Sequence, residues 1–250
     1  GKPFEYADYA LKLGLKEIGF SDHAPLVSHD DPSITMSLDQ LPYYQQMIED
    51  LKVQYAKKQL SVKIGIEADY IPGYEEKTKK ILDSYPYDYV LGSVHFIGDF
   101  AFDNPQQKDR LKTNNIDKVY QNYHNLLRKS AQSGLFDIMA HVDLVKKFGD
   151  RATKDLTDEI KMTAQVFKKS GVVIEINSSG LRKPVQEIYP SISELTIYRE
   201  EGVAITFGSD AHAPAEVGFG FKEALALAQK AGYREYVLFE KRKIVSKIKI

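Results

Sequence analysis

The amino-acid sequence predicts an α/β protein in which parallel strands curl into a barrel. Short apolar runs typical of buried strands alternate with amphipathic stretches typical of helices. Six clear strands and a possible seventh favour a barrel over an open sheet. No glycine-rich phosphate turn follows a predicted strand, which disfavours a nucleotide-binding Rossmann domain. We expect one domain over residues 1–250.

The helices are predicted from apolar positions spaced three and four residues apart. The first covers residues 4–13 and ends at Gly14. A capping box of Ser37 and Gln40 opens the second, which runs to about residue 58, and Ser191 with Glu194 opens another that reaches residue 201. The other predicted helices cover residues 73–82, 116–132, 153–169 and 221–231.

The strands are predicted from short apolar runs bounded by turn residues. They cover residues 15–20, 62–67, 87–95, 136–141, 172–177 and 203–207. The tail from Tyr236 is expected as either a final strand or a solvated extension. Residues 97–115 are expected as a loop, long enough to indicate a function such as a lid.

The composition limits the class of partner and the kind of metal site. Lys and Arg number 34 against 35 Asp and Glu, so no net field attracts nucleic acid or an anionic membrane. The absence of cysteine leaves His, Asp and Glu as the metal ligands. No apolar run approaches the roughly 20 residues of a spanning helix, and no signal peptide opens the sequence. A cytoplasmic protein is therefore the expectation.

Five of the predicted strands end in a histidine or an acidic residue or are closely followed by one. A single such residue is ordinarily a hydrogen-bonded side chain or a helix N-cap, but five at equivalent positions indicate a metal site, because parallel strands end at one face. Imidazole and carboxylate groups suit Mn, Fe or Zn. The candidate ligands are His23, Glu67, His95, His141, Asp210 and His212.

Four nearby residues are not expected to bind the metal. Asp22 is expected to orient an imidazole, while the N-cap of the following turn is an equally good explanation of Asp143. His29 lies in a proline-containing loop and His124 in mid-helix, so both are expected to be solvent-facing or packing residues.

A second candidate site follows the strand that ends at Asn177. Two serines come next, and then the adjacent cations Arg182 and Lys183. A guanidinium takes two phosphate oxygens at once, so Arg182 is a candidate phosphate ligand. Lys183 is equally well explained as a surface residue. Metal ions beside Arg182 would suit hydrolysis of a phosphate monoester by a metal-bound hydroxide that attacks phosphorus in line.

The order of these motifs resembles the PHP (polymerase and histidinol phosphatase) family of metal-dependent phosphoesterases. Further motifs resemble its histidinol-phosphate phosphatase branch. The resemblance spans nearly the whole chain and rests on Ser21-Asp22-His23, Gly65-Ile66-Glu67, Ser93-Val94-His95-Phe96, Phe102-Asp103-Asn104-Pro105, Ala140-His141-Val142-Asp143, Asn177-Ser178-Ser179-Gly180-Leu181-Arg182-Lys183-Pro184 and Gly208-Ser209-Asp210-Ala211-His212.

The resemblance implies a distorted (β/α)7, TIM-like barrel that carries up to three metal ions. Such an enzyme hydrolyses L-histidinol phosphate to L-histidinol and phosphate in histidine biosynthesis. Glu67 would bridge two ions, and His95 with His141 would complete one site. Asp210 would help to hold another ion. His23 and His212 would serve the third ion or the phosphate, and with Asp210 they are the residues expected to take part in catalysis. Asn177, Arg182 and Lys183 are expected to bind the substrate.

One departure from the family pattern leaves alternatives open. The family opens with a strand that ends in His-x-His, and no histidine precedes His23 here, so we expect the first barrel strand to be missing from this sequence. The alternatives are a PHP phosphoesterase that acts on another small phosphate ester or on nucleic acid ends, and a non-catalytic metal- or phosphate-binding protein. The oligomeric state is not predicted.

Overall fold

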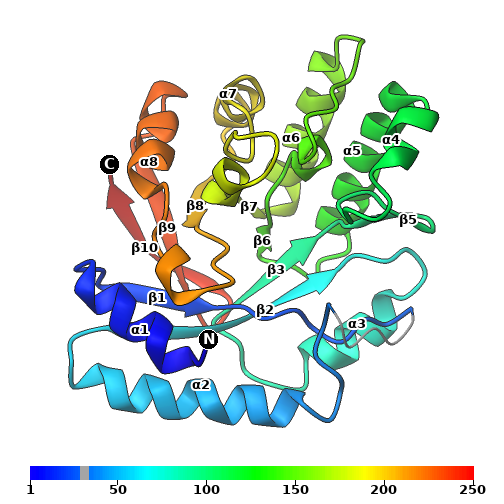
Figure 1. The fold of residues 1–250 in the computed structure, drawn as a ribbon. Helices are drawn as coiled ribbons and strands as arrows, with labels where there is room; N and C mark the ends of the chain where they lie inside the picture. The colour runs from blue at the N-terminus through cyan, green and yellow to red at the C-terminus, as the bar shows by residue number, and fades with distance from the viewer. Residues whose placement is uncertain (29–33) are drawn as a thin grey trace.

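The core of the fold is a curled sheet of six parallel strands (Figure 1). The structure, a computed structural model, describes residues 1–28 and 34–250. In sheet order the strands are β1 (Glu17–Phe20), β2 (Ser61–Asp69), β3 (Tyr89–Ser93), β6 (Ile138–Met139), β7 (Val173–Asn177) and β8 (Ile205–Gly208). These are the six strands predicted from the apolar runs, although β6 is shorter than predicted and ends before His141.

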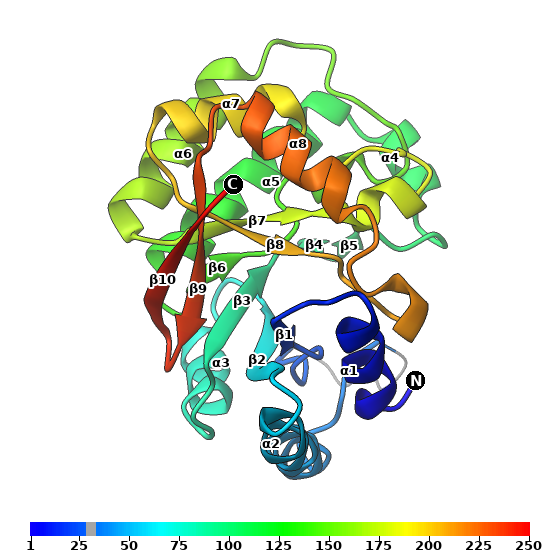
Figure 2. The ribbon, with the colours of Figure 1, turned by 90° about the vertical axis from the view of Figure 1, so that its left-hand side faces the viewer.

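Helices cover the outside of the sheet, with α2 beside β1 and β2 and α5 to α8 beside β6 to β8 (Figures 1 and 2). None of the helices in the described part of the chain is both long and apolar enough to span a membrane. The helices are α1 (Pro3–Lys12), α2 (Leu41–Ala56), α3 (Glu75–Leu82), α5 (Ile116–Gln132), α6 (Thr157–Ser170), α7 (Ile192–Glu200) and α8 (Phe221–Lys230).

The two predicted capping boxes form only in part. The Ser191 hydroxyl accepts the backbone N–H of Glu194 (3.5 Å), as predicted for the start of α7. At α2 the side chain of Gln40 accepts the backbone N–H of Ser37 (2.9 Å), but the Ser37 hydroxyl donates to Asp39 and no side chain caps the helix. The helix therefore begins at Leu41, later than predicted.

The segment predicted as a loop over residues 97–115 contains regular structure. Strand β4 (Phe96–Ile97) pairs antiparallel with β5 (Phe100–Ala101), and α4 covers Asp109–Thr113. Phe100 and Phe102 are buried, which anchors the segment in the core. The prediction was wrong because two-residue strands and a five-residue helix are too short to produce a periodic pattern.

The tail forms strands, the first of the two predicted alternatives, but there are two of them and they do not join the parallel sheet. Strands β9 (Glu235–Glu240) and β10 (Lys243–Lys249) form a separate antiparallel hairpin. Val237 and Phe239 pack on residues of β3, β6 and β7. In the turn, Arg242 donates two hydrogen bonds to Asp137, which directly precedes β6 (2.9 and 3.1 Å). The hairpin therefore closes the N-terminal end of the sheet, opposite the strand ends that carry the candidate ligands.

Candidate metal centre

The four histidines predicted as metal ligands lie in a row at the C-terminal ends of the strands. The ring centroids of His23 and His95 are 5.8 Å apart, and those of His95 and His141 are 5.0 Å apart. His212 extends the row at the other end, 6.2 Å from His23. Parallel strands place residues that are far apart in sequence at one edge, so the fold itself brings these rings together.

Glu67 lies at the centre of this row. Its Oε1 is 3.1 Å from His141 Nε2, 3.8 Å from His95 Nε2 and 3.9 Å from His23 Nδ1. Segment 22–24 continues the pairing of β1 with β2, because Glu67 donates its N–H to Asp22 and accepts that of Ala24. Burial raises the pKa of Glu67, but the neighbouring imidazoles outweigh it and hold the pKa far below its usual range.

These residues fit a divalent cation. Potential ligand atoms of Glu67, His95 and His141 all lie within 4.8 Å of one another. Nδ1 of His141 is buried and has no hydrogen-bond partner in the described part of the chain. Three imidazoles around one carboxylate oxygen are a donor set that Zn, Mn and Fe accept.

Asp69 contacts this group and was missed by sequence reasoning. Its Oδ1 lies 2.8 Å from Nδ1 of His95, and this contact orients the ring so that Nε2 faces Glu67. Burial opposes protonation, but the charges of Asp69, Asp103 and Glu67 raise the pKa of His95 to about 10. Asp69 lies two residues after Glu67 on one strand, so the period-two pattern gave a usable signal.

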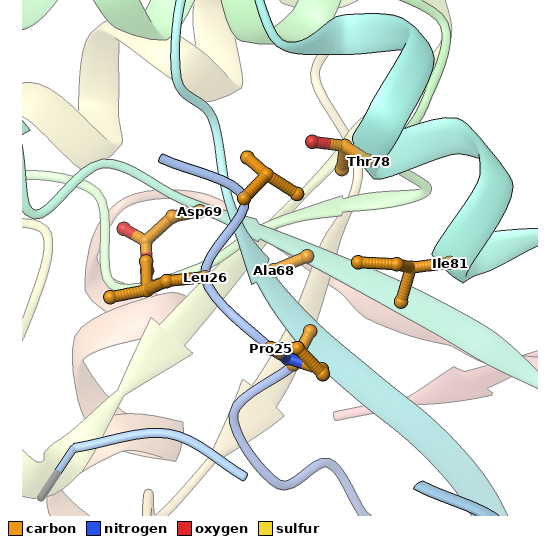
Figure 3. Close-up of a pocket in the computed structure, with 8 residues that line it drawn as sticks. Pro25, Leu26, Ala68, Asp69, Thr78 and Ile81 are labelled. Carbon is orange, nitrogen blue, oxygen red and sulfur yellow. The ribbon is translucent and has the colours of Figure 1, made fainter. Parts of the chain in front are cut away.

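Asp69 also lines a small pocket beside α3 (Figure 3). Its volume is about 10 Å³, close to the space of one water molecule, and Ala68 and Ile81 contribute apolar surface. This pocket is too small to be a substrate site.

Three residues that were predicted not to bind the metal are Asp22, His124 and His29. The carboxylate of Asp22 accepts the backbone N–H of His23 (2.9 Å), and Asp69 makes the imidazole contact expected of Asp22. The buried His124 lies 3.3 Å from the hydroxyl of Thr163, as a packing residue would. His29 lies outside the described residues.

Asp143 is the N-cap residue of the turn that follows it, as predicted, but its side chain makes no capping hydrogen bond there. Its Oδ2 lies 2.6 Å from Nζ of the fully buried Lys146 and accepts the backbone N–H of Ser191 (3.1 Å). Nζ of Lys146 is also 3.0 Å from Glu187. These bonds connect the loop after His141 to the start of α7.

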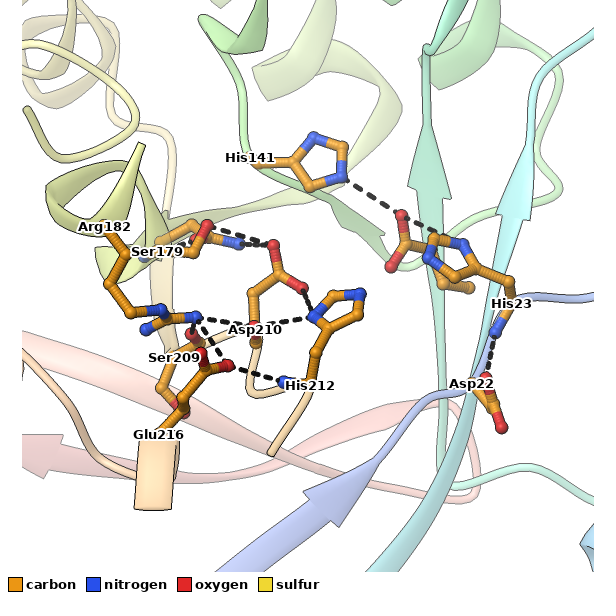
Figure 4. A network of polar contacts seen from close by, with 12 residues as sticks. Asp22, His23, His141, Ser179, Arg182, Ser209, Asp210, His212 and Glu216 are labelled. Atoms are coloured by element: carbon orange, nitrogen blue, oxygen red, sulfur yellow. Dashed lines mark hydrogen bonds and ion pairs between the residues drawn. The ribbon is translucent and has the colours of Figure 1, made fainter. Parts of the chain in front are cut away.

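Asp210 and His212 lie beside one another and face His23 (Figure 4), and both line the same cavity as Glu67. The Ser179 hydroxyl donates to Asp210 Oδ2 (3.0 Å), and Asn177 Nδ2 lies 3.4 Å from the same oxygen. Burial and the charge of Glu67 raise the pKa of Asp210, but the nearby imidazoles of His141 and His212 and the Ser179 hydroxyl keep it below its usual value.

Arg182 is held against the turn that carries Asp210. Its Nη2 donates to the carbonyl oxygens of Ser209 (2.9 Å) and Asp210 (2.8 Å), and Glu216 lies 3.4 Å away (Figure 4). Its Nη1 is buried and has no partner within residues 1–28 and 34–250. The backbone of the adjacent Lys183 donates to the carbonyl oxygen of Gly180 (3.1 Å) and accepts the N–H of Gln186 (2.9 Å).

A cavity of about 900 Å³ leads to these residues. Its lining includes Glu67, Asn177 and Asp210, and residues of both β1 and β8. The volume lies within the range of about 300–1,000 Å³ for small-molecule sites. In the described part of the chain, no strand pairs with the outer edge of β1 or β8, which end the sheet.

The sequence matches one family model and several relatives that are named as histidinol-phosphatases. The sequence model of the family described as "PHP domain" matches residues 1–179. A "Probable histidinol-phosphatase" of Deinococcus radiodurans is 38% identical over 245 residues, with 98% of this chain and 92% of that protein covered. A "Histidinol-phosphatase" of Bacillus subtilis is 31% identical over 244 residues, with 88% and 91% covered.

The fold is also similar to a solved structure. The crystal structure of histidinol phosphate phosphatase from Lactococcus lactis, complexed with Zn, L-histidinol and phosphate, matches with a TM-score of 0.80. The two sequences are 23% identical, and the match covers 98% of this chain and 92% of that one. This likeness confirms the predicted fold class.

Proposed function

Because this chain belongs to the PHP domain family, and within it to the histidinol-phosphatases, we propose that it is a metal-dependent phosphomonoesterase. It hydrolyses L-histidinol phosphate to L-histidinol and phosphate in histidine biosynthesis. The observation that carries this proposal is the carboxylate of Glu67, which has three imidazole nitrogens within 3.9 Å at the end of the cavity.

Up to three divalent ions, Mn, Fe or Zn, are the proposed cofactors. Glu67 would bridge two of them, with His95 and His141 completing one site and Asp210 helping to hold the other. His23 would serve the third ion or the phosphate, as would His212. Bound ions would neutralise charge on the phosphoryl oxygens and lower the pKa of water.

His23, His212 and Asp210 are the proposed catalytic residues. Nδ1 of His212 lies 3.1 Å from the carbonyl oxygen of Asp210. Because a carbonyl only accepts, Nδ1 carries a proton, and Nε2 is the ring atom left to exchange a proton with the leaving alcohol. The His212 side chain is 65% exposed, so a substrate that enters from solvent reaches it.

The phosphate group would be bound by Arg182, Asn177 and Lys183. The free Nη1 of Arg182 supplies a charged donor, while its Nη2 keeps the guanidinium in place. Asn177 lines the cavity, and Lys183 follows Arg182 at the end of the short helix η2 (Ser178–Arg182).

Residues 1–250 are proposed to form one barrel domain whose opening lies between β1 and β8. The cavity lining supports this opening, since it includes apolar side chains from both flanking strands, among them Ile18 and Phe207.

The proposal is tested by measuring phosphate release from L-histidinol phosphate, other small phosphate esters and single-stranded DNA. We expect preferential, metal-dependent release from L-histidinol phosphate and none in the Glu67→Gln variant. Preferential release from another ester or from DNA ends would support a different PHP phosphoesterase. Tight binding of the ester by the metal-loaded protein without turnover would identify a non-catalytic binding protein.

A further inference from the structure

Glu175 is a buried carboxylate in the cavity, with no role in the reaction described above. It lies on β7, and its side chain reaches the backbone of a candidate ligand. Its Oε2 accepts the backbone N–H of His141 (2.9 Å) and the side-chain N–H of Asn177 (2.9 Å). One carboxylate oxygen therefore connects the segment after β6 to the end of β7.

The bond to His141 replaces a missing strand contact. Strand β6 ends at Met139, the N–H of Ala140 donates to Gly92, and the chain then turns at His141 with a φ of +26°. A buried N–H without an acceptor is destabilising, and the side chain of Glu175 supplies that acceptor. Glu175 thus fixes the backbone of His141, whose imidazole lies 3.1 Å from Glu67.

The bond to Asn177 extends this support to the other side of the centre. The Oδ1 of Asn177 accepts the backbone N–H of Ser179 (2.9 Å), which fixes the orientation of the amide. Its Nδ2 is thereby directed to Glu175 (2.9 Å) and lies 3.4 Å from Asp210 Oδ2. The Asn177 amide therefore connects Glu175 to the carboxylate of Asp210, which follows β8.

Strand β8 leaves room for the Glu175 side chain. Gly208 pairs with Asn177, and a Cβ added at Gly208 would lie 1.7 Å from Glu175 Oε1. Any side chain at Gly208 would therefore displace the carboxylate. This steric requirement is independent of the hydrogen bonds and points to the same position for the carboxylate.

We propose that Glu175 is a positioning residue of the metal centre, which couples His141 on one side to Asp210 on the other. It acts through the His141 backbone and the Asn177 amide, and it sets the affinity and coordination geometry of the bound ion. The inference rests on the proposed metal dependence, so its test measures metal binding and not turnover.

The experiment measures Zn²⁺ affinity by competition with a chromophoric chelator, and the visible absorption spectrum at saturating Co²⁺. Glu175→Gln removes the charge, whereas Gly208→Ala keeps the charge and displaces the carboxylate. Glu17→Gln is the matched control, because Glu17 lines the same cavity from β1 and also accepts a hydrogen bond, from the Ser61 hydroxyl (3.0 Å). Thermal melting checks that each variant is folded.

We expect about 10–100-fold weaker Zn²⁺ binding in Glu175→Gln and in Gly208→Ala, as for other residues that orient metal ligands. We also expect a changed Co²⁺ spectrum in Glu175→Gln and neither effect in Glu17→Gln. If Gly208→Ala does not fold, the Co²⁺ spectrum of Glu175→Gln decides. A purely electrostatic effect would weaken binding and leave the spectrum unchanged, whereas displaced ligands would alter the spectrum.

Wild-type affinity in Glu175→Gln, an unchanged spectrum, or an equal loss in Glu17→Gln would overturn the inference. Failure of the wild-type protein to bind Zn²⁺ or Co²⁺ would overturn the proposed metal dependence as well, so the two failures are distinguishable.

Discussion

Replacing Glu67 by Gln should remove metal binding while the fold persists. The substitution keeps the size of the side chain and replaces a carboxylate by a neutral amide. The site is buried, and Oε1 has imidazole nitrogens at 3.1, 3.8 and 3.9 Å. The amide also brings two N–H donors into a position where ring nitrogens and a cation require an acceptor.

The magnitude follows from the loss of one charge at these distances. Two unit charges about 4 Å apart interact by about 4 kcal/mol at an effective dielectric constant of about 20. At about 1.4 kcal/mol for each factor of ten, the dissociation constant of a divalent ion should rise at least about a thousandfold. The retained volume should keep the core around Ile66 and Ala68 packed.

The assay is isothermal titration of the metal-free protein with Zn²⁺, for wild type and Glu67→Gln. Glu17→Gln is the control, because it removes a carboxylate from the same cavity without touching the histidines. Thermal melting without metal should show that the Glu67→Gln variant is folded. A folded variant that binds Zn²⁺ within tenfold of wild type would refute the assigned role of Glu67.

Three further substitutions test separate parts of the account. Asp69→Asn should weaken Zn²⁺ binding about 10–100-fold in the same titration, because its carboxylate orients His95; unchanged affinity would remove that role. Arg182→Ala should raise the KM for L-histidinol phosphate roughly 10–100-fold through loss of a charged donor, and an unchanged KM would exclude Arg182 from the phosphate site. Lys146→Met should lower the free energy of unfolding by about 3–5 kcal/mol in urea, because Asp143 stays buried without its partner; a loss below about 1 kcal/mol would contradict this.

The parallel sheet and the family were predictable because their signals are local or ordered along the sequence. Each strand is a short apolar run, and the residues after those runs meet at one edge by the nature of a parallel sheet. The convergence of His23, His95 and His141 on Glu67 required no knowledge of loop geometry. The family comparisons confirm the resemblance drawn from the order of these motifs.

The parts that were missed depend on contacts between distant residues. Asp143 precedes a turn, so its sequence position is that of an N-cap, but its carboxylate pairs with Lys146 and accepts the backbone N–H of Ser191. The structure of the tail was ambiguous from its sequence, because alternating Lys and Ile residues fit an exposed strand and a solvated extension equally well. The bonds from Arg242 to Asp137 anchor it as a hairpin, and no local pattern encodes them.

Metal-dependent hydrolysis is tested by phosphate release from L-histidinol phosphate, measured with added Mn²⁺ or Zn²⁺ and with a chelator. We expect release that depends on added metal, disappears with the chelator and returns when metal is restored. Release that persists in the chelated protein, or no release from a protein shown by titration to hold its metal, would contradict it.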